Sequence, residues 1–214
     1  MATTTPNYGW DVPTSTDYVK DGATAIETLG DDIDASLYSA LLGKKASSVL
    51  IASGTFTGAS TFDVSSCFTT TYKNYRIVIN MDSSTTSDQV YFRWLTGTVT
   101  PDTNSIYVYS GNQATTTAGS FAAIAATADN KGHLGVNYST GADNLFDVEI
   151  SSPNLAKRSG WIYRCIGPSS TNNIQTFWGA GTTNATTQHT GFRILANSGT
   201  LTGSIAVYGY NTTV

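Results

Sequence analysis

The chain has 214 residues, a net charge of −4 and only 12% Asp, Glu, Lys and Arg, which is about half the proportion usual in soluble proteins. It has no basic stripe and no apolar run near the roughly 20 residues that span a bilayer, so we expect neither nucleic-acid binding nor membrane insertion. Its main polar residues are Thr, Ser, Asn and Gly, which favour half-buried strands and turns. The composition therefore predicts a mainly β protein.

The first predicted part is an extended arm over residues 1–20. This segment shows neither the period of two that marks strands nor a helical period, and it cannot bury enough surface to order by itself. It also lacks the basic and apolar regions of a secretion signal, so we expect assembly in a cytoplasm. Its aromatic side chains suggest ordering against a partner, with a plain flexible terminus as the alternative. The candidate anchor residues are Tyr8, Trp10, Val12, Pro13 and Tyr18.

A short helix is predicted over residues 21–43. Asp21 suits the N-cap position, and Gly43 lies where a helix stop is expected. Apolar residues recur between them at spacings of three and four, which indicates one apolar stripe. A helix of this length is marginal alone, so we expect three copies to bundle into a stem; the alternative is an amphipathic helix lying on its own domain. The predicted stem contacts are Ile26, Leu29, Ile33 and Leu37.

After a linker at residues 44–47, the pattern changes to a period of two and keeps it over residues 48–214. Short apolar runs separated by turn residues predict a jelly-roll-like antiparallel β-sandwich. Several strands are apolar on both faces, so one face should meet the second sheet and the other a neighbouring subunit of a homotrimer. The expected strands are Val49–Phe56, Tyr75–Met81, Val90–Leu95, Ser105–Tyr109, His133–Tyr138, Phe146–Ser151, Trp161–Ile166, Ile174–Trp178, Phe192–Ala196 and Ser204–Tyr210.

The polar stretches between these strands predict long loops, because Gly, Asn, Ser and Pro favour turns. One stretch, residues 120–128, is rich in alanine and fits either a strand or a short helix. The expected loops are Asp82–Gln89, Thr96–Asn104, Gly111–Ser120, Pro168–Asn173 and Gly179–Thr190.

One pair of carboxylates is considered for catalysis. Asp147 and Glu149 lie two residues apart in a predicted strand, so both point to one face. They fit either an acid pair at a cleft, as glycosidases use, or a solvated strand face that meets Arg164 or Arg158. No nucleophile motif or phosphate-binding loop is present, so we expect no enzymatic activity and no cofactor.

The cysteines and histidines give no metal-binding spacing. Cys67 and Cys165 are expected to be buried free thiols, with a disulfide between them as the alternative. His133 and His189 stand alone in the sequence, so surface or loop positions are expected and no metal site is predicted. The alternative is that one of them meets its two symmetry copies on a trimer axis.

Ligand binding is better supported than catalysis. A sugar ring can stack on an aromatic side chain while amides and carboxylates bind its hydroxyl groups, and binding loops on a rigid scaffold are common sites of function. Each candidate also fits the core or a trimer interface. The receptor-binding candidates are Tyr107, Tyr109, Asn112, Gln113, Tyr138, Trp178 and His189.

Two parts of the chain resemble proteins of tailed bacteriophages. The first part contains Tyr8-Gly9-Trp10, Val12-Pro13 and Lys20-Asp21-Gly22-Ala23, followed by the helical stripe. This order resembles the opening of many phage tail and fibre proteins, in which a short peptide and a helix attach the protein to the virion. The second part resembles a recurring C-terminal module of phage fibres, and the resemblance rests on Phe68 and residues 72–79, 90–94, 198–200 and 203–210.

The resemblance implies a structural virion protein, a homotrimeric tail fibre. It would bind a baseplate or tail protein through residues 1–20 and a host-surface glycan or protein through its distal sandwich. The alternatives are a trimeric capsid decoration or cement protein and a glycan-degrading tailspike enzyme. The second is disfavoured because the chain has only two glutamates, Glu27 and Glu149.

Overall fold

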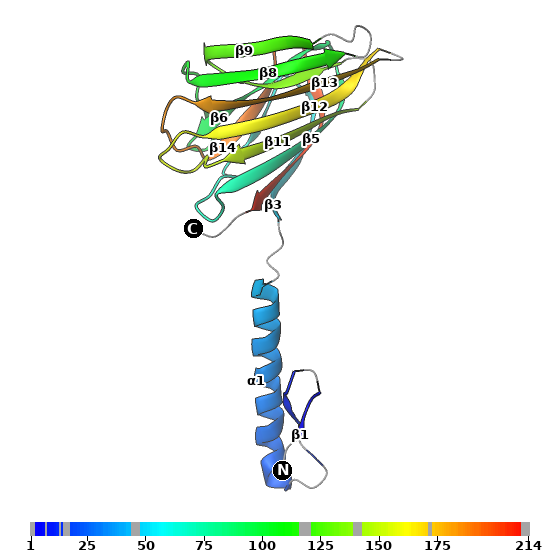
Figure 1. The fold of residues 1–214 in the computed structure, drawn as a ribbon, viewed down its shortest axis with the longest axis vertical. Helices are drawn as coiled ribbons and strands as arrows, with labels where there is room; N and C mark the ends of the chain where they lie inside the picture. The colour runs from blue at the N-terminus through cyan, green and yellow to red at the C-terminus, as the bar shows by residue number, and fades with distance from the viewer. Residues whose placement is uncertain are drawn as a thin grey trace. The chain divides into compact units, whose positions relative to one another are not determined.

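The computed structural model describes residues 3–6, 8–12, 14, 18–43, 48–115, 121–138, 143–170 and 173–210. The chain divides into two units, Met1–Ser47 and Ser48–Val214. Figure 1 shows a hairpin and a helix in the first unit and two layers of strands in the second. The predicted anchor residue Pro13 and the predicted linker, residues 44–47, lie outside the described residues.

The first unit contains a two-stranded hairpin within the predicted arm. Strands β1 (Thr3–Thr4) and β2 (Asp11–Val12) pair antiparallel. The connection is closed by backbone hydrogen bonds from Thr5 N to Trp10 O, 2.9 Å, and from Gly9 N to Thr5 O, 3.0 Å. Gly9 has a φ of 69°, which glycine adopts without steric cost. The rings of Tyr8 and Trp10 stack with centroids 5.0 Å apart.

Helix α1 spans Val19–Gly43, so it begins two residues before the predicted N-cap. The prediction that Asp21 caps the helix is wrong: its backbone N–H donates to Tyr18 O at 2.9 Å, and Asp21 lies within the first turn. A carboxylate is still favourable there because the first turn carries the positive end of the helix dipole. The helix ends at Gly43, where the sequence predicts a stop.

The hairpin packs on one side of the helix. Trp10 Nε1 donates to Ser36 Oγ at 3.0 Å, and Leu29 and Ile33 on the same side are half-buried, as positions three and seven residues before Ser36 should be. By contrast, Ile26 and Leu37 are 64% and 55% exposed. The predicted apolar stripe is therefore divided, with its middle near the hairpin and its two ends facing solvent.

The second unit is mainly β, as predicted, and consists of two antiparallel sheets. The strands of the eight-stranded sheet, in spatial order, are β3 (Val49–Ala59), β15 (Leu201–Tyr210), β5 (Asn74–Ser84), β11 (Asn144–Ser151), β12 (Gly160–Ser170), β13 (Asn173–Thr183), β8 (Tyr107–Thr115) and β9 (Phe121–Asp129). In Figure 1 this sheet is in front, and the five-stranded sheet lies behind it. The five-stranded sheet contains β10 (Gly132–Asn137), β6 (Asp88–Thr96), β14 (Gly191–Ala196) and β4 (Thr61–Val64), with β7 (Thr100–Pro101) beside β6.

The core lies between the two sheets and is rich in aromatic rings. In β5 the alternation places Tyr75, Ile77 and Ile79 inside. Trp161 of β12 contacts Phe92 of β6 across the core, with ring centroids 5.0 Å apart. Aromatic side chains bury the most apolar surface per residue, so these contacts stabilise the sandwich strongly.

The ten predicted strands all coincide with observed strands, but the predicted loops are too long. Gly111–Thr115 continues β8, Gly179–Thr183 continues β13, and the ends of Pro168–Asn173 belong to β12 and β13. The ambiguous stretch is strand β9, and β4 and β7 were not predicted. Polar residues favour loops in sequence, whereas in this sheet many of them occupy the solvent-facing positions of strands.

Candidate functional site

The candidate site lies on the outer face of the eight-stranded sheet, over β11, β12 and β13. Because side chains alternate along a strand, each core residue here is followed by one on the outer face. In β12, Trp161, Tyr163 and Cys165 are buried, while Ile162, Arg164 and Ile166 are exposed. The three strands therefore present a second set of side chains away from the core.

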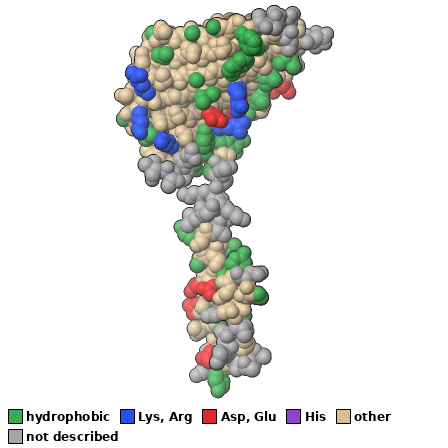
Figure 2. Space-filling model, viewed as in Figure 1, with side chains coloured by type: hydrophobic (Ala, Val, Ile, Leu, Met, Phe, Trp, Pro, Cys, Tyr) green, Lys and Arg blue, Asp and Glu red, His purple; other side chains and the backbone are tan. Residues whose placement is uncertain are grey.

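Several of these outward side chains are large and apolar. Ile162 is 57% exposed, Ile166 45% and Trp178 of β13 38%. Leu145 of β11 lies opposite Ile166 in the strand register and is also exposed. Figure 2 shows this face, with hydrophobic side chains beside a cluster of acidic and basic ones. Contiguous exposed apolar side chains of this kind mark interaction surfaces more often than scattered ones do.

The charged cluster centres on Asp147 of β11. Arg76 of β5 donates from Nε to Asp147 Oδ1 at 2.8 Å and from Nη2 to Oδ2 at 3.2 Å. Arg164 of β12 donates from Nη2 to Asp147 Oδ2 at 2.6 Å. The carboxylate is 12% exposed, whereas the side chains of Arg76 and Arg164 are 51% and 66% exposed. Strand pairing explains this geometry, since both arginines lie on strands that flank β11.

The two arginines hold Asp147 in its charged form. Burial alone would raise the pKa of Asp147, but the hydrogen bonds and positive charges of Arg76 and Arg164 outweigh burial and lower it. A general acid needs the opposite shift, because it must stay protonated until it gives up its proton. Of the two interpretations of Asp147 and Glu149, the charged strand face that meets Arg164 is the one observed for Asp147.

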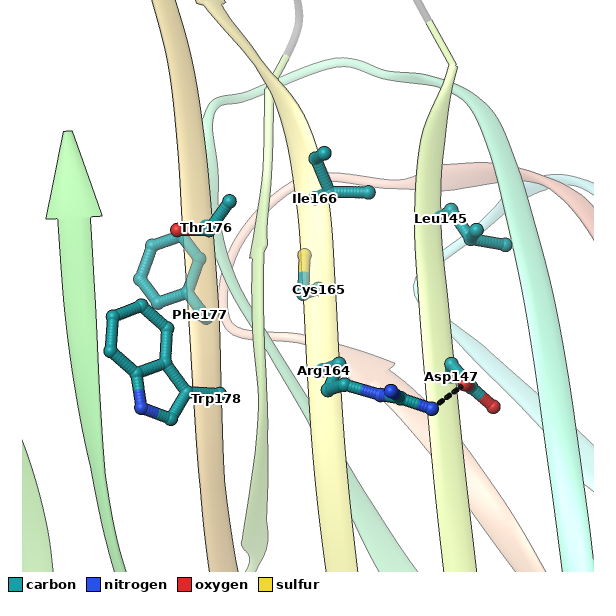
Figure 3. Close-up of a pocket in the computed structure, with 8 residues that line it drawn as sticks. All are labelled: Leu145, Asp147, Arg164, Cys165, Ile166, Thr176, Phe177 and Trp178. Atoms are coloured by element: carbon teal, nitrogen blue, oxygen red, sulfur yellow. Dashed lines mark hydrogen bonds and ion pairs between the residues drawn. The ribbon is translucent and has the colours of Figure 1, made fainter. Parts of the chain in front are cut away.

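A shallow depression of about 480 Å³ lies over these strands, within the range of small-ligand sites. Figure 3 shows Trp178 on one side of it and the Arg164–Asp147 pair on the other, with Thr176 next to Trp178. The depression is lined by Leu145, Asp147, Arg164, Cys165, Ile166, Thr176, Phe177 and Trp178. A neighbouring hollow shares Arg164 and Trp178 and extends over Asn112 of β8.

The receptor-binding candidates divide into outward and buried residues. Trp178 and Asn112 lie on the outer face and are Cα partners in the β8–β13 register. Gln113 is half-buried opposite Phe177, a core residue, and Tyr138 is half-buried just after β10. Only part of the predicted set is therefore brought together.

The other three candidates are corrected by the structure. Tyr107 and His189 are fully buried, and Tyr109 is 7% exposed. The hydroxyl group of Tyr107 donates to Asp102 O at 3.1 Å and accepts from Trp94 N at 2.8 Å, inside the core. These side chains have no free surface for a receptor, because they join the two sheets.

Both histidines are buried, so a surface position is wrong for each. His133 lies in strand β10, whereas His189 does lie in a loop, between β13 and β14. His133 lies among aromatic rings, stacked on Tyr109 with centroids 5.9 Å apart. The ring of His189 stacks on Trp94 at 5.1 Å, and its Nε2 atom lies 3.8 Å from Asp102 Oδ2. Burial lowers the pKa of each histidine to about 4. Within the described ranges, no three His, Cys, Asp or Glu side chains come together as metal ligands would.

The prediction of two buried free thiols is confirmed. Cys67 and Cys165 are both buried and not joined in a disulfide. Burial raises the pKa of each thiol to about 12. Since the thiolate is the reactive form, this shift disfavours reaction near neutral pH of Cys165, which lines the depression.

Apart from Trp178, the residues that line the depression were not predicted as binding residues. A signal was present for two of them, because Arg164 and Ile166 alternate with Tyr163 and Cys165 along the same strand. Apolar residues on the side of a strand that faces away from its core indicate a contact surface. Nothing in the sequence pairs Leu145 with Ile166, since that contact depends on the strand register.

No family model matches this chain, and neither a curated protein nor a solved structure matches it. In the part of the chain that the structure describes, no helix combines the length and apolarity that a bilayer-spanning segment needs. Functional proposals for this protein therefore rest on its own sequence and geometry.

Proposed function

We propose that this protein is a structural component of a tailed-phage virion, a tail fibre that attaches the particle to the host cell surface. The observation that carries the proposal is the outer face of the eight-stranded sheet. There an exposed tryptophan, Trp178, borders a depression whose other side carries the hydrogen-bonding pair Arg164 and Asp147. An aromatic platform with polar groups at its edge suits a saccharide, which has both an apolar face and hydroxyl groups.

The small first unit supports the proposal that the protein assembles into the virion. Its helix exposes Ile26, Leu37 and Tyr38, and its hairpin exposes Tyr8 at 72%. Exposed apolar side chains on so small a unit favour association with other chains. The proposed arrangement is a homotrimer whose stems bundle through α1, with residues 1–20 bound to a tail or baseplate protein.

Repeated weak sites would act together in such a fibre. Each trimer would present three depressions, and each virion several trimers. Linked binding events strengthen one another because the second occurs at a high effective concentration. A host glycan held weakly by each depression would therefore suffice for firm attachment of the particle.

Adsorption inhibition by the purified protein tests this function. Host bacteria incubated with the full-length chain should bind fewer phage particles, and Trp178→Ala should lose most of this inhibition. The matched control is Val99→Ala, which removes an apolar side chain that is 57% exposed in the β6–β7 connection. If the wild-type protein does not inhibit adsorption at any concentration, the attachment function is wrong.

Immunogold electron microscopy of the virion with antibodies against residues 48–214 tests the position. Gold at the tail or baseplate is the expected result. Gold distributed over the head would identify the protein as a capsid decoration protein instead. Release of reducing sugar from host polysaccharide by the pure protein would identify a glycan-degrading enzyme, an outcome that the lowered pKa of Asp147 argues against.

A further inference from the structure

We infer that the depression between Trp178 and Arg164 binds an anionic saccharide, one whose sugar ring carries a carboxylate or a phosphate group. The inference rests on the proposed attachment function and adds the chemical class of the ligand. The two arginines on either side of Asp147 are unequally hydrogen-bonded.

Arg76 binds Asp147 through two nitrogens, whereas Arg164 binds it through one. Arg76 donates to Asp147 from Nε and Nη2. The Cα partner of Arg76 on β11 is Glu149. Arg164 gives only Nη2 to Asp147, and the described residues provide no acceptor for its Nε and Nη1. Arg164 is also the more exposed of the two side chains, at 66%. Its remaining donors therefore face solvent.

A guanidinium group with open donors is suited to an oxyanion. The Nε–H and Nη1–H groups point from different edges of the planar group, so each can donate one hydrogen bond to a carboxylate or a phosphate, and such charge-assisted bonds are stronger than neutral ones. The negative charge of Asp147 is offset by the two arginines that donate to its oxygens. Asp147 also holds the Arg164 side chain in place, so less conformational entropy is lost on binding.

The strand register places the two binding groups next to each other. Trp178 of β13 and Arg164 of β12 are Cα partners on paired strands. In Figure 3 their side chains diverge, and the guanidinium group of Arg164 extends toward Asp147 of β11. A sugar ring stacked on Trp178 would thus carry its acidic substituent over β12, toward Arg164. The ring of Phe121 contacts Trp178 edge-on at 6.1 Å, which limits the orientations of the indole.

The charged cluster favours a saccharide over a second protein chain on this face. The centres of protein–protein interfaces are depleted in charged residues. A flat protein partner would have to desolvate Arg76, Arg164 and Asp147 together, and the cost of removing charges from water often exceeds the attraction between them. A saccharide leaves part of the cluster hydrated and contributes hydrogen-bonding groups of its own.

The test is an array of bacterial surface saccharides, each printed in three forms. One form is native, one has its carboxylates reduced to alcohols, and one has its phosphates removed. The full-length wild-type protein should bind native acidic saccharides at least tenfold more strongly than the matching neutral form. The treatment that abolishes binding distinguishes a carboxylate ligand from a phosphate ligand.

Three variants assign the effect to the depression. Arg164→Gln should lose at least tenfold in binding to acidic saccharides while its weak binding to neutral forms stays unchanged. Trp178→Ala should lose binding to both forms, because it removes the stacking surface. Arg158→Gln removes an exposed arginine outside the depression and should behave as wild type. Unchanged melting temperatures would show that all three variants fold.

Three outcomes would overturn the inference. Strongest binding to neutral saccharides, with Arg164→Gln equal to wild type, would leave attachment intact and remove the acidic ligand. Failure to bind any saccharide, together with normal inhibition of adsorption, would mean that the receptor is a protein. A change in solution mass on Trp178→Ala would instead make this face an interface between copies of the chain.

Discussion

At the residue scale, the two buried histidines couple the stability of the sandwich to pH. His133 and His189 are both fully buried, and each has a pKa lowered to about 4 by burial. For His189, the nearby Asp102 opposes part of this shift. In the unfolded chain each histidine has its ordinary pKa of 6.5. The unfolded state therefore binds more protons than the folded state between these two values.

The sign of the effect follows from this difference. Stability rises with pH wherever the unfolded state binds more protons, so the contribution of each histidine is complete above about pH 6.5 and is lost as the pH falls toward 4. A shift of this size corresponds to up to about 3 kcal/mol per histidine at pH 4. Urea unfolding at pH 7, 5 and 4 should show stability falling across this window.

Replacement of both histidines separates their contribution to the loss of stability at low pH from that of the carboxylates, which also titrate there. The double variant His133→Phe and His189→Phe should lose much less stability between pH 7 and 4 than wild type. Phenylalanine keeps an aromatic ring against Tyr109 and Trp94 without a titratable group. Equal losses in both proteins would mean that folding does not shift the pKa of the histidines.

At the element scale, the sheets depend on small residues where large core rings come close. A Cβ atom on Gly181 of β13 would lie 2.1 Å from Cζ2 of Trp161 on the paired strand β12. Overpacking of a dense core typically costs about 1–3 kcal/mol. Gly181→Ala should therefore reduce the unfolding free energy by about that amount, measured by urea unfolding at pH 7.

The neighbouring residue provides the control for this substitution. Ala180 precedes Gly181 in β13 and is exposed on the outer face, so Ala180→Ser should change stability by less than about 0.5 kcal/mol. A comparable loss in both variants would show that β13 tolerates no change at all. That result would contradict the assignment of the cost to the contact with Trp161.

The strands could be predicted from the sequence because their alternation is local. In β5 and β12 the core residues recur at every second position, and the strand assignments there were correct. The register was not predictable, because it depends on contacts between distant segments: Arg76 and Asp147 are 71 residues apart in the chain. The buried histidines were missed for a similar reason. A single polar residue gives no period, and its burial is decided by the rings that other strands place around it.

The hairpin beside α1 was also not predicted, and it changes the test of the stem. Leu29 and Ile33 lie half-buried on the side of the helix near the hairpin, so substituting them would disturb the hairpin as well as any helix bundle. Ile26 and Leu37 are exposed and report on self-association alone. The double variant Ile26→Asp and Leu37→Asp should lower the solution mass of the full-length protein, measured by light scattering over a dilution series.

Two exposed polar positions on the same helix give a matched control for charge. Thr28→Asp and Ser39→Asp add the same two carboxylates at positions that are already polar and exposed, so this variant should keep the wild-type mass. An unchanged mass in the Ile26 and Leu37 variant would place the subunit contacts in the sandwich instead of the stem.

At the scale of the whole molecule, the two units are expected to separate folding from assembly. The aromatic core lies entirely within residues 48–214, so removal of residues 1–47 takes away no core side chain. The shortened protein should therefore unfold at the same temperature and with the same circular dichroism change per sandwich as the full-length chain.

The same deletion should remove the protein from virions, since the proposed anchor residues Tyr8, Trp10, Val12, Pro13 and Tyr18 are all in the deleted segment. Particles grown with only the shortened chain should lack it in mass spectrometry and should adsorb poorly to the host. Normal incorporation would mean that the virion binds the sandwich itself. Loss of folding would mean that the first unit stabilises the second, and the division of roles between them would then be wrong. Retained folding without incorporation is the one combination that fits an anchor and a separate receptor-binding domain.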